Sequence, residues 1–450
     1  MQMFHRLRWQ PVLLLAAVAC CTLRADAQVP SANVGFAPAY APPDTGAPAA
    51  LPRYTIAQPP YGQTRIAGVP LYELEDTTPP QDVLYEPTPL ERYLSAALKS
   101  MWFRTEYLLW DLDEPGDVAL GSPVFAVDDP TQPFNIFVNN QQITVRVFDL
   151  EHVSLKDNNG IRGTLGVPLT FGTLELSAFG LEHTTQRHTP RDKDFGTMEL
   201  GFPPGAVSQP TFFIATSTFT NGSILDETGL GTNLFLYDRF FQIDFDTDVW
   251  GAEANFVTDP YVPGDGFKWR PLLGFRFLRL RERLTQQGGL DIRDENNPDI
   301  VTATLVSTID SEVRNLMFAP QVGLRLQWVA PWFTISFEPK VALGVNAKQT
   351  TVLADQIRGI GDPTVVTTID RQNLAAIGEL GVSARVRVTE SIAAFISYQE
   401  IWMANVARAG TSIYYNDFGV GAPMTGITAK SDNQFYNMRG LSLGFEVRFP

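Results

Sequence analysis

The sequence predicts an all-β protein, an antiparallel transmembrane β-barrel of about ten strands with a disordered proline-rich N-terminal arm. Apolar and polar residues alternate with a strict period of two in many separate runs. These runs reach the length of about 9–11 residues that a tilted strand needs to cross a bilayer. Short and long connections between the runs also alternate, which is typical of outer-membrane barrels with short periplasmic turns and long outer loops.

The N-terminus predicts export. Basic residues are followed by an apolar run and by Ala25-Asp26-Ala27, so residues 1–27 have the parts of a secretory signal peptide. Both cysteines, Cys20 and Cys21, lie in this segment. We therefore expect a mature chain without disulfides or thiolate metal sites.

The next part of the chain is predicted to be a linker. Residues 28–89 are rich in proline, with pairs such as Pro42-Pro43 and Pro59-Pro60, and show no sustained apolar period. Apolar residues at helical spacing then predict a short amphipathic helix over residues 90–100, at the membrane surface or the barrel mouth. The barrel is predicted to occupy residues 101–450.

Charge and hydropathy exclude two classes of protein. The 450-residue chain has a formal net charge of −15, and the leader removes three arginines and one aspartate, which makes the mature charge −17. A nucleic-acid partner is not expected from this balance. After the leader, no run approaches about 18 consecutive apolar residues, so a transmembrane helix is not expected either.

The central hairpin shows the strand pattern most clearly. Val322, Leu324, Leu326 and Trp328 alternate with polar residues or glycine, and a second alternating run follows a turn at Pro331. One face of each strand is apolar and suits lipid, while the other carries charges. The ten predicted strands are 102–110, 161–170, 173–182, 249–257, 269–280, 321–328, 333–346, 379–388, 392–402 and 441–449.

The segments between these pairs are predicted to be long outer loops. They include residues 281–320 and 347–378. Strand-like runs at 143–148 and 212–220 could add one hairpin, which would raise the number of strands to twelve. The chain termini are expected on the periplasmic side, because the strand number is even.

Tryptophan placement provides a further argument. The seven tryptophans after the leader lie at or near predicted strand ends, where aromatic girdles meet the two membrane interfaces. They are Trp102, Trp110, Trp250, Trp269, Trp328, Trp332 and Trp402.

Short motifs along residues 101–450 resemble a β-barrel porin family best known from planctomycete bacteria. The matching pieces are WFRTEYLLW at 102–110, GIRGTLG at 160–166, WGAEAN at 250–255, GFRFLRL at 274–280, ELGV at 379–382, SYQEIWMANVARAG at 397–410 and GLSLGFEVRF at 440–449. The resemblance implies an outer-membrane barrel. The final strand is also similar to the signal that outer-membrane insertion machinery recognises, although Pro450 follows the terminal aromatic residue Phe449.

The inward faces of the predicted strands carry a mixed set of charges. The predicted lumen-lining residues are Arg104, Glu106, Arg162, Glu175, Glu253, Arg276, Arg325, Glu338, Lys340, Glu379, Arg385, Arg387, Glu446 and Arg448. Such a lining could form a constriction that screens solutes by charge. The alternative is that these ion pairs fill the narrow lumen of a ten-stranded barrel.

Enzymatic and metal sites are weaker hypotheses. His183 and His188 lie in an outer segment with Asp192 and Asp194, which would allow a general-base pair, but no catalytic motif surrounds them. Acidic groups, such as the trio Asp244, Asp246 and Asp248, could bind Ca²⁺, but their spacing matches no EF-hand loop. We therefore predict no catalytic residues, metal site or cofactor.

The sequence leaves two functions open, of which we favour the first. The first is passive passage of small solutes through a charged lumen in the outer membrane. The second is a non-conducting structural or surface-adhesion barrel that acts through its long outer loops. Outer-membrane lipid and the insertion machinery are the expected partners, the N-terminal arm is expected in the periplasm, and the oligomeric state stays open.

Overall fold

The computed structural model describes residues 100–124, 127–138, 141–190, 212–221, 230–260, 264–294, 297, 300–357, 359–417 and 427–449. The predicted signal peptide (1–27), the linker (28–89) and all but the last residue of the predicted helix (90–100) lie outside these ranges. None of the described residues belongs to a helix long and apolar enough to span a membrane.

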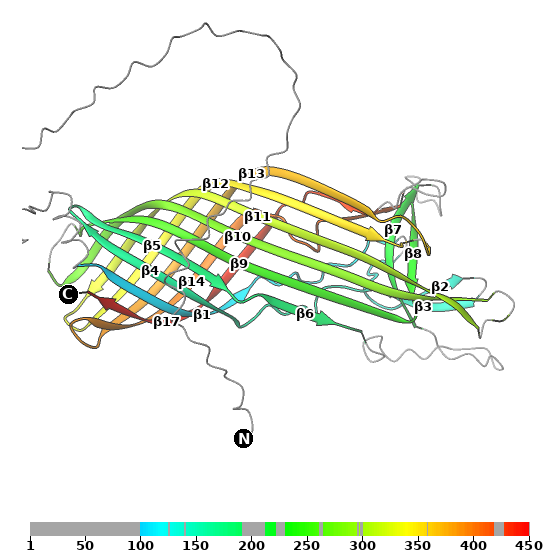
Figure 1. The fold of residues 1–450 in the computed structure, drawn as a ribbon, viewed down its shortest axis with the longest axis horizontal. Helices are drawn as coiled ribbons and strands as arrows, with labels where there is room; N and C mark the ends of the chain where they lie inside the picture. Colours follow the sequence, from blue (N-terminus) through cyan, green and yellow to red (C-terminus); the bar gives the residue numbers. More distant parts are fainter. Residues whose placement is uncertain are drawn as a thin grey trace, which may run out of the picture. The chain divides into compact units, whose positions relative to one another are not determined.

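Seventeen strands make up the secondary structure of this described part (Figure 1). They are β1 (Trp102–Leu112), β2 (Phe134–Val138), β3 (Gln141–Val147), β4 (Asn158–Leu169), β5 (Gly172–Leu181), β6 (Thr184–His188), β7 (Phe212–Asn221), β8 (Leu230–Tyr237), β9 (Phe240–Thr258), β10 (Gly266–Arg293), β11 (Val301–Val329), β12 (Phe333–Asp355), β13 (Val365–Arg387), β14 (Ile392–Val406), β15 (Ile413–Asp417), β16 (Ile427–Ala429) and β17 (Gln434–Arg448).

Ten of these strands close into an antiparallel barrel. Their order is β10-β11-β12-β13-β14-β17-β1-β4-β5-β9, and β9 pairs back with β10. Each of the ten contains one of the predicted strands, so the predicted barrel and its strand number are confirmed. Closure leaves every strand of the ring paired on both edges, which removes the exposed sheet edges that would be unstable in lipid.

The short turns gather at one end of the barrel, where its two terminal strands also meet (Figure 1). Only two residues separate β4 from β5, and three separate β11 from β12. The Phe449 amide donates to the Met101 carbonyl at 2.9 Å and joins the end of β17 to the start of β1. We call this the short-turn end.

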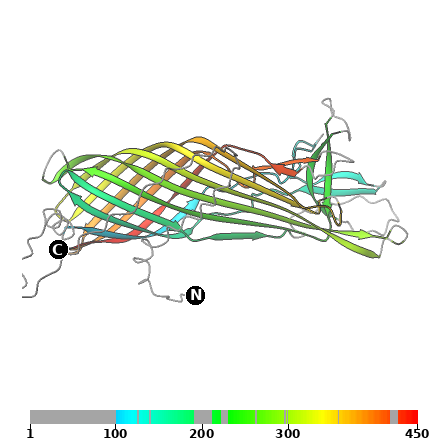
Figure 2. The same cartoon turned by 45° about the horizontal axis from the view of Figure 1, so that its top comes forward.

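The strands run far beyond the length needed to cross a bilayer. β10 has 28 residues and β11 has 29, against the about 9–11 needed. Within the segments predicted to be loops, residues 281–293, 301–320, 347–355 and 365–378 therefore continue the barrel wall as paired strands (Figure 2). That prediction was wrong, because we ended each strand where its outward residues stop being apolar.

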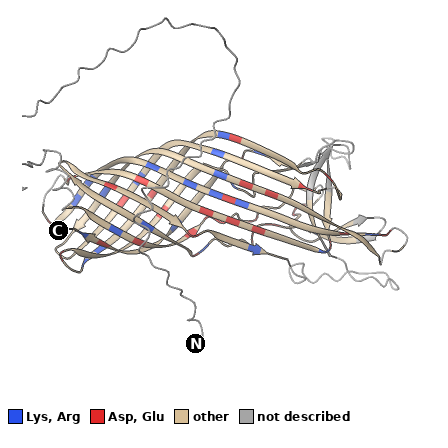
Figure 3. Ribbon diagram, in the orientation of Figure 1, with Lys and Arg blue, Asp and Glu red and all other residues tan. Residues whose placement is uncertain are grey.

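The polarity of the wall inverts along these strands. On β10 the outward residues change from Leu273, Phe275 and Phe277 to a charged series that begins at Arg279. The inward residues change in the opposite sense, from the buried Arg276 to apolar side chains. Figure 3 shows the charged residues along the middle of the strands. The apolar outer band marks the lipid-facing zone, and the charged zone beyond it faces water, as in a soluble sheet.

A second sheet lies among the long connections. It has the order β16-β15-β7-β3-β2, with β8 also paired to β7. The runs predicted to add a hairpin are in this sheet, where β3 and β7 pair in parallel from Thr144 with Phe212 to Val147 with Ala215. The ring therefore has ten strands and not twelve.

The inside of the water-facing zone is filled by a hydrophobic core. Most strands of the ring contribute to one contiguous buried cluster, and so do connecting segments that fold inward. The largest members with almost no exposure include Trp110, Tyr436, Phe148 and Phe245. Trp110 therefore does not belong to a membrane girdle as predicted. Trp102 also lies on the inward face, where the Arg104 guanidinium lies 5.1 Å from its ring centroid.

Candidate functional site

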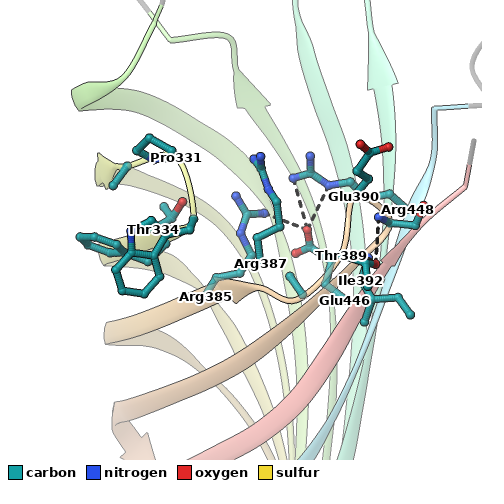
Figure 4. Close-up of a pocket in the computed structure, with 14 residues that line it drawn as sticks. Pro331, Thr334, Arg385, Arg387, Thr389, Glu390, Ile392, Glu446 and Arg448 are labelled. Carbon is teal, nitrogen blue, oxygen red and sulfur yellow. Dashed lines mark hydrogen bonds and ion pairs between the residues drawn. The ribbon is translucent and has the colours of Figure 1, made fainter.

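Charged side chains line the lumen inside the lipid-facing zone, in layers that start at the short-turn end. At the mouth, the carboxylate of Glu446 accepts from Arg104 Nη2 at 2.7 Å. It also accepts from Arg385 Nη1 at 2.8 Å (Figure 4). Arg448 is more distant, at 3.4 Å. Glu446 is only 1% exposed, so one buried carboxylate serves three guanidinium groups.

The next layer is a dense ion-pair network around Lys340. Its Nζ lies 3.0 Å from Glu338 and from Glu379 and 3.3 Å from Glu253. Arg276 Nη2 donates to Glu253 at 2.7 Å and also pairs with Glu379. These residues come from β9, β10, β12 and β13, which lie within five consecutive strands of the ring, so the network ties one side of the barrel together.

Arg325 extends this network to another strand. Its Nη1 and Nη2 donate to the two carboxylate oxygens of Glu175 at 2.6 and 2.7 Å, and its Nε pairs with Glu338. Bidentate pairing of this kind fixes both position and angle of the guanidinium. The contact joins β11 to β5 across the lumen, since these strands are not neighbours in the ring.

A polar cavity of about 110 Å³ lies between these layers. Uncharged side chains complete its lining, including Thr164, Ser177, Asn255, Gln327 and Ser336. Arg162 lies 3.7 Å from Glu106 and 5.2 Å from the ring centroid of Trp110. Arg162 therefore joins the polar cavity to the hydrophobic core above it.

A short buried segment lies inside the ring beyond the cavity. Residues 405–412, here called the plug, begin in the last two residues of β14, where a bulge lies between Met403 and Val406. Asn405 has a φ of 60°, a left-handed conformation that asparagine adopts more readily than most residues, and the chain turns inward there. Val406, Ala407 and Ala409 are buried.

Arg408 anchors the plug on two sides. Its Nε donates to Glu282 Oε1 at 2.8 Å, and its Nη1 donates to Asp113 Oδ2 at 2.7 Å. The guanidinium also lies 4.6 Å from the ring centroid of Tyr436. Burial raises the pKa of Asp113, and the positive charge and hydrogen bond of Arg408 only partly offset this effect.

The backbone of the plug is bound to the inner wall as well. Asn315 donates to the Ala407 carbonyl and accepts from the Ala407 amide, both at 2.9 Å. Ser311 donates to the Ala409 carbonyl at 2.9 Å. Buried backbone groups need such partners, and the polar residues of β11 supply them inside an otherwise apolar core.

The fourteen predicted lumen-lining residues can now be placed. Ten of them line the polar cavity: Arg104, Glu106, Arg162, Glu175, Glu253, Arg325, Glu338, Lys340, Glu379 and Arg385. Arg276 pairs within the central network, and Arg387, Glu446 and Arg448 lie at the mouth beside Arg385. Whether any of them contacts a passing solute stays a prediction.

The plug and its anchors were missed. Glu282 lies two residues beyond the predicted end of its strand, and Asp113 and Arg408 lie in segments without a strand pattern. The available signal was the motif ARAG at 407–410, which belongs to the family-like pieces but has no periodicity.

The outer histidines lie in two different environments. His188 stacks on Phe148 with ring centroids 5.2 Å apart, and His183 Nε2 lies 3.7 Å from Asp246. Asp192 and Asp194 lie outside the described residues. Asp244 binds Arg187 at 2.7 Å, and no cluster of potential metal ligands occurs within the part of the chain that the structure describes.

Comparison with known proteins identifies the family. A model of the family described as "Putative beta barrel porin-7 (BBP7)" matches residues 102–449, which is most of the chain. The chain belongs to this family. The resemblance predicted from the sequence motifs is thereby confirmed, and the BBP7 barrel is an outer-membrane barrel. A search of curated proteins gave no match.

Several solved proteins are similar to this BBP7 barrel. The outer membrane protease OmpT from Escherichia coli has 7% identity and a TM-score of 0.38, covering 78% of this chain and 97% of that one. The toluene transporter TodX from P. putida has 8% identity and a TM-score of 0.26, covering 79% and 92%. The anion-selective porin from Comamonas acidovorans has 8% identity and a TM-score of 0.13, covering 78% and 99%.

Proposed function

We propose that this protein is a plugged, non-conducting outer-membrane barrel that anchors its water-facing strands and second sheet at the cell surface. The hydrophobic core that fills the lumen carries this proposal. Its buried side chains come from every strand of the ring except β4, so they meet from opposite sides of the ring. The plug lies within this core and is hydrogen-bonded to the wall.

Passive solute passage, the function that we favoured from the sequence, has less support. A ten-stranded barrel is narrow, and barrels of about eight strands are filled by their own side chains. Here a charged network in the lipid-facing zone and an apolar core beyond it occupy the lumen in series. Solutes could pass only if the plug and the connecting segments left the core.

Single-channel recording tests the proposal. The folded full chain in a planar bilayer is expected to give no discrete current steps at moderate voltage. Reproducible steps of constant size from the unmodified protein would overturn the closed barrel and favour the porin function.

Thiol labelling provides a second test that does not depend on current. Both cysteines lie in the predicted signal peptide, so a single introduced cysteine is a clean probe. Gln327→Cys places a thiol in the polar cavity, on the short-turn side of the plug. A membrane-impermeant maleimide is expected to label it from the short-turn side only. Equal labelling from both sides would contradict the plugged lumen.

The orientation of the barrel follows from the turn lengths. We assign the short-turn end to the periplasm, because short turns lie on that side in bacterial outer-membrane barrels. The chain therefore enters β1 from the periplasmic side. The apolar alternation of β17 supports recognition by the insertion machinery. We assign no catalytic role, since His188 stacks on Phe148 and His183 lies beside Thr185 and Asp246 without a recognisable catalytic motif.

A further inference from the structure

We propose that the periplasmic mouth of the barrel contains a binding site for a soluble oxyanion, a phosphate or carboxylate group. The site consists of Arg104, Arg385, Arg387 and Arg448 around Glu446, here called the arginine cluster. Four guanidinium groups, which stay protonated at all ordinary pH values, lie around the buried carboxylate of Glu446, and the Glu390 carboxylate also lines the mouth, so four positive charges face two negative ones. The cluster therefore has a surplus of positive charge that an anion would balance.

The pairing within the cluster leaves many donors available. Glu446 accepts from Arg104 and Arg385 at normal hydrogen-bond distances, while Arg448 lies 3.4 Å away, and Arg387 forms no ion pair with any described residue. The Nε of Arg104 is buried and has no hydrogen-bond partner within the described part of the chain. A guanidinium has five N–H donors in a planar fork that matches a carboxylate or phosphate.

Two aromatic rings hold the Arg104 guanidinium in place. The Arg104 guanidinium lies 4.1 Å from the ring centroid of Phe395 and 5.1 Å from that of Trp102. Such cation–π contacts leave the edge of the guanidinium, with its N–H groups, directed away from the rings. Arg104 and Arg385 also line the polar cavity of about 110 Å³, which offers room for a small anion.

The geometry favours a soluble anion over a lipid headgroup. Arg104, Arg385 and Arg448 alternate with the lipid-facing Thr105, Val386 and Val447, so their side chains belong to the inner face of the barrel. Figure 4 shows Arg385, Glu446 and Arg448 lining the pocket at the mouth. An anion in the periplasm reaches this pocket directly, whereas a headgroup lies outside the wall. The site lies on the short-turn side of the plug. Anion binding there does not depend on whether the lumen conducts.

Calorimetric titration of inorganic phosphate into the folded full chain in a neutral detergent tests this site. Saturable binding is expected, at an affinity that falls as chloride is added. Arg448→Gln and Arg387→Gln are each expected to weaken binding about tenfold, the loss typical of one charge-assisted hydrogen bond. Absence of saturable binding would overturn the proposal.

Arg314→Gln is the matched control. Arg314 is 46% exposed and Arg448 is 49% exposed, and both pair with a glutamate, but Arg314 lies in the water-facing zone beyond the bilayer. The control is expected to leave phosphate binding unchanged. An equal loss of phosphate affinity in Arg314→Gln and Arg448→Gln would mean that the overall charge of the protein attracts phosphate. This result would overturn the proposed site.

Two further arms separate the remaining explanations. Glu446→Gln removes the competing carboxylate and is expected to tighten phosphate binding several-fold in folded protein. Weaker binding in folded Glu446→Gln would overturn the competition on which the proposal rests. Binding to phosphatidylglycerol vesicles but not to free phosphate would assign the cluster to a headgroup and overturn the soluble anion.

Discussion

Arg408 Nε donates to Glu282 Oε1 at 2.8 Å, which fastens a segment inside the lumen to the inner wall of β10. Glu282 is only 1% exposed. Two charges so far from water are stable only as a pair, so the loss of either partner would leave the other buried and uncompensated. The complete ion pair therefore stabilises the plug, whereas loss of one partner destabilises it.

Arg408→Met is expected to loosen the plug. It leaves Glu282 without its cation, so we expect a loss of about 3–5 kcal/mol in the free energy of unfolding, measured in urea. We also expect intermittent current steps in planar bilayers. Silent, wild-type-like recordings from a destabilised Arg408→Met protein would show that the apolar core closes the lumen without this anchor.

The double variant Arg408→Met with Glu282→Met is the control for that result. Because it removes both charges and keeps apolar volume, it is expected to recover much of the stability lost in the single variant. If the loss of unfolding free energy in the double variant equals the sum of the losses in Arg408→Met and Glu282→Met, the two residues are not directly coupled.

Lys340→Met tests the central network in the lipid-facing zone. Lys340 contacts three glutamates within 3.3 Å, and its removal is expected to cost about 3–5 kcal/mol of unfolding free energy. Arg283→Gln breaks the 2.6 Å pair with Asp310 on the exposed outer face and is expected to cost about 0–1 kcal/mol. If the two variants lose similar amounts of unfolding free energy, the Lys340 network is as exposed to water as the Arg283–Asp310 pair on the outer face.

The pH dependence of stability tests the environment of Asp113. Burial raises its pKa above the ordinary value of 3.8, so the folded protein holds this proton more tightly than the unfolded chain. This contribution to stability is complete below pH 3.8 and is lost as the pH rises through the raised pKa. Asp113→Asn cannot ionise, so its stability relative to wild type is expected to increase between pH 3 and pH 7 in urea titrations. A relative decrease would show that pairing with Arg408 outweighs burial.

A pair of substitutions on one face of β12 locates the edge of the bilayer. Leu343→Arg places a charge among lipid-facing side chains and is expected to cost about 2–4 kcal/mol if it lies near the bilayer centre. Gln349→Arg lies on the same face three outward positions further along, opposite Arg314 in the charged zone, and is expected to be tolerated. Folding yield in vesicles measures both. Equal yields would place the bilayer edge elsewhere on the strand.

The lipid-facing zone could be predicted because the bilayer imposes a simple rule on each strand. Phe445 and Leu443 face lipid while Glu446 and Ser442 face inward, and the same alternation repeats in all ten strands. The even strand number, the order of the ring and the charged lining follow from that pattern. The family match over residues 102–449 agrees with the motifs found on these strands.

The rest of the barrel could not be predicted from the same rule. Beyond Phe277 the next outward residues of β10 are Arg279, Arg281 and Arg283, so the alternation continues with its polarity reversed and resembles a polar loop. The plug has no periodicity, and its contacts depend on residues far apart in the chain, such as Arg408 and Asp113. Only the closed ring brings these residues together.

The reversal of polarity along β10 and β11 also protects the alignment of the strands during folding. A slip of one residue between neighbours exchanges the two faces of a strand. In this barrel such a slip would turn Arg276 toward lipid and Arg281 into the apolar core at the same time. Each strand therefore meets lipid at one end and water at the other, and only one alignment places the right residues in both environments.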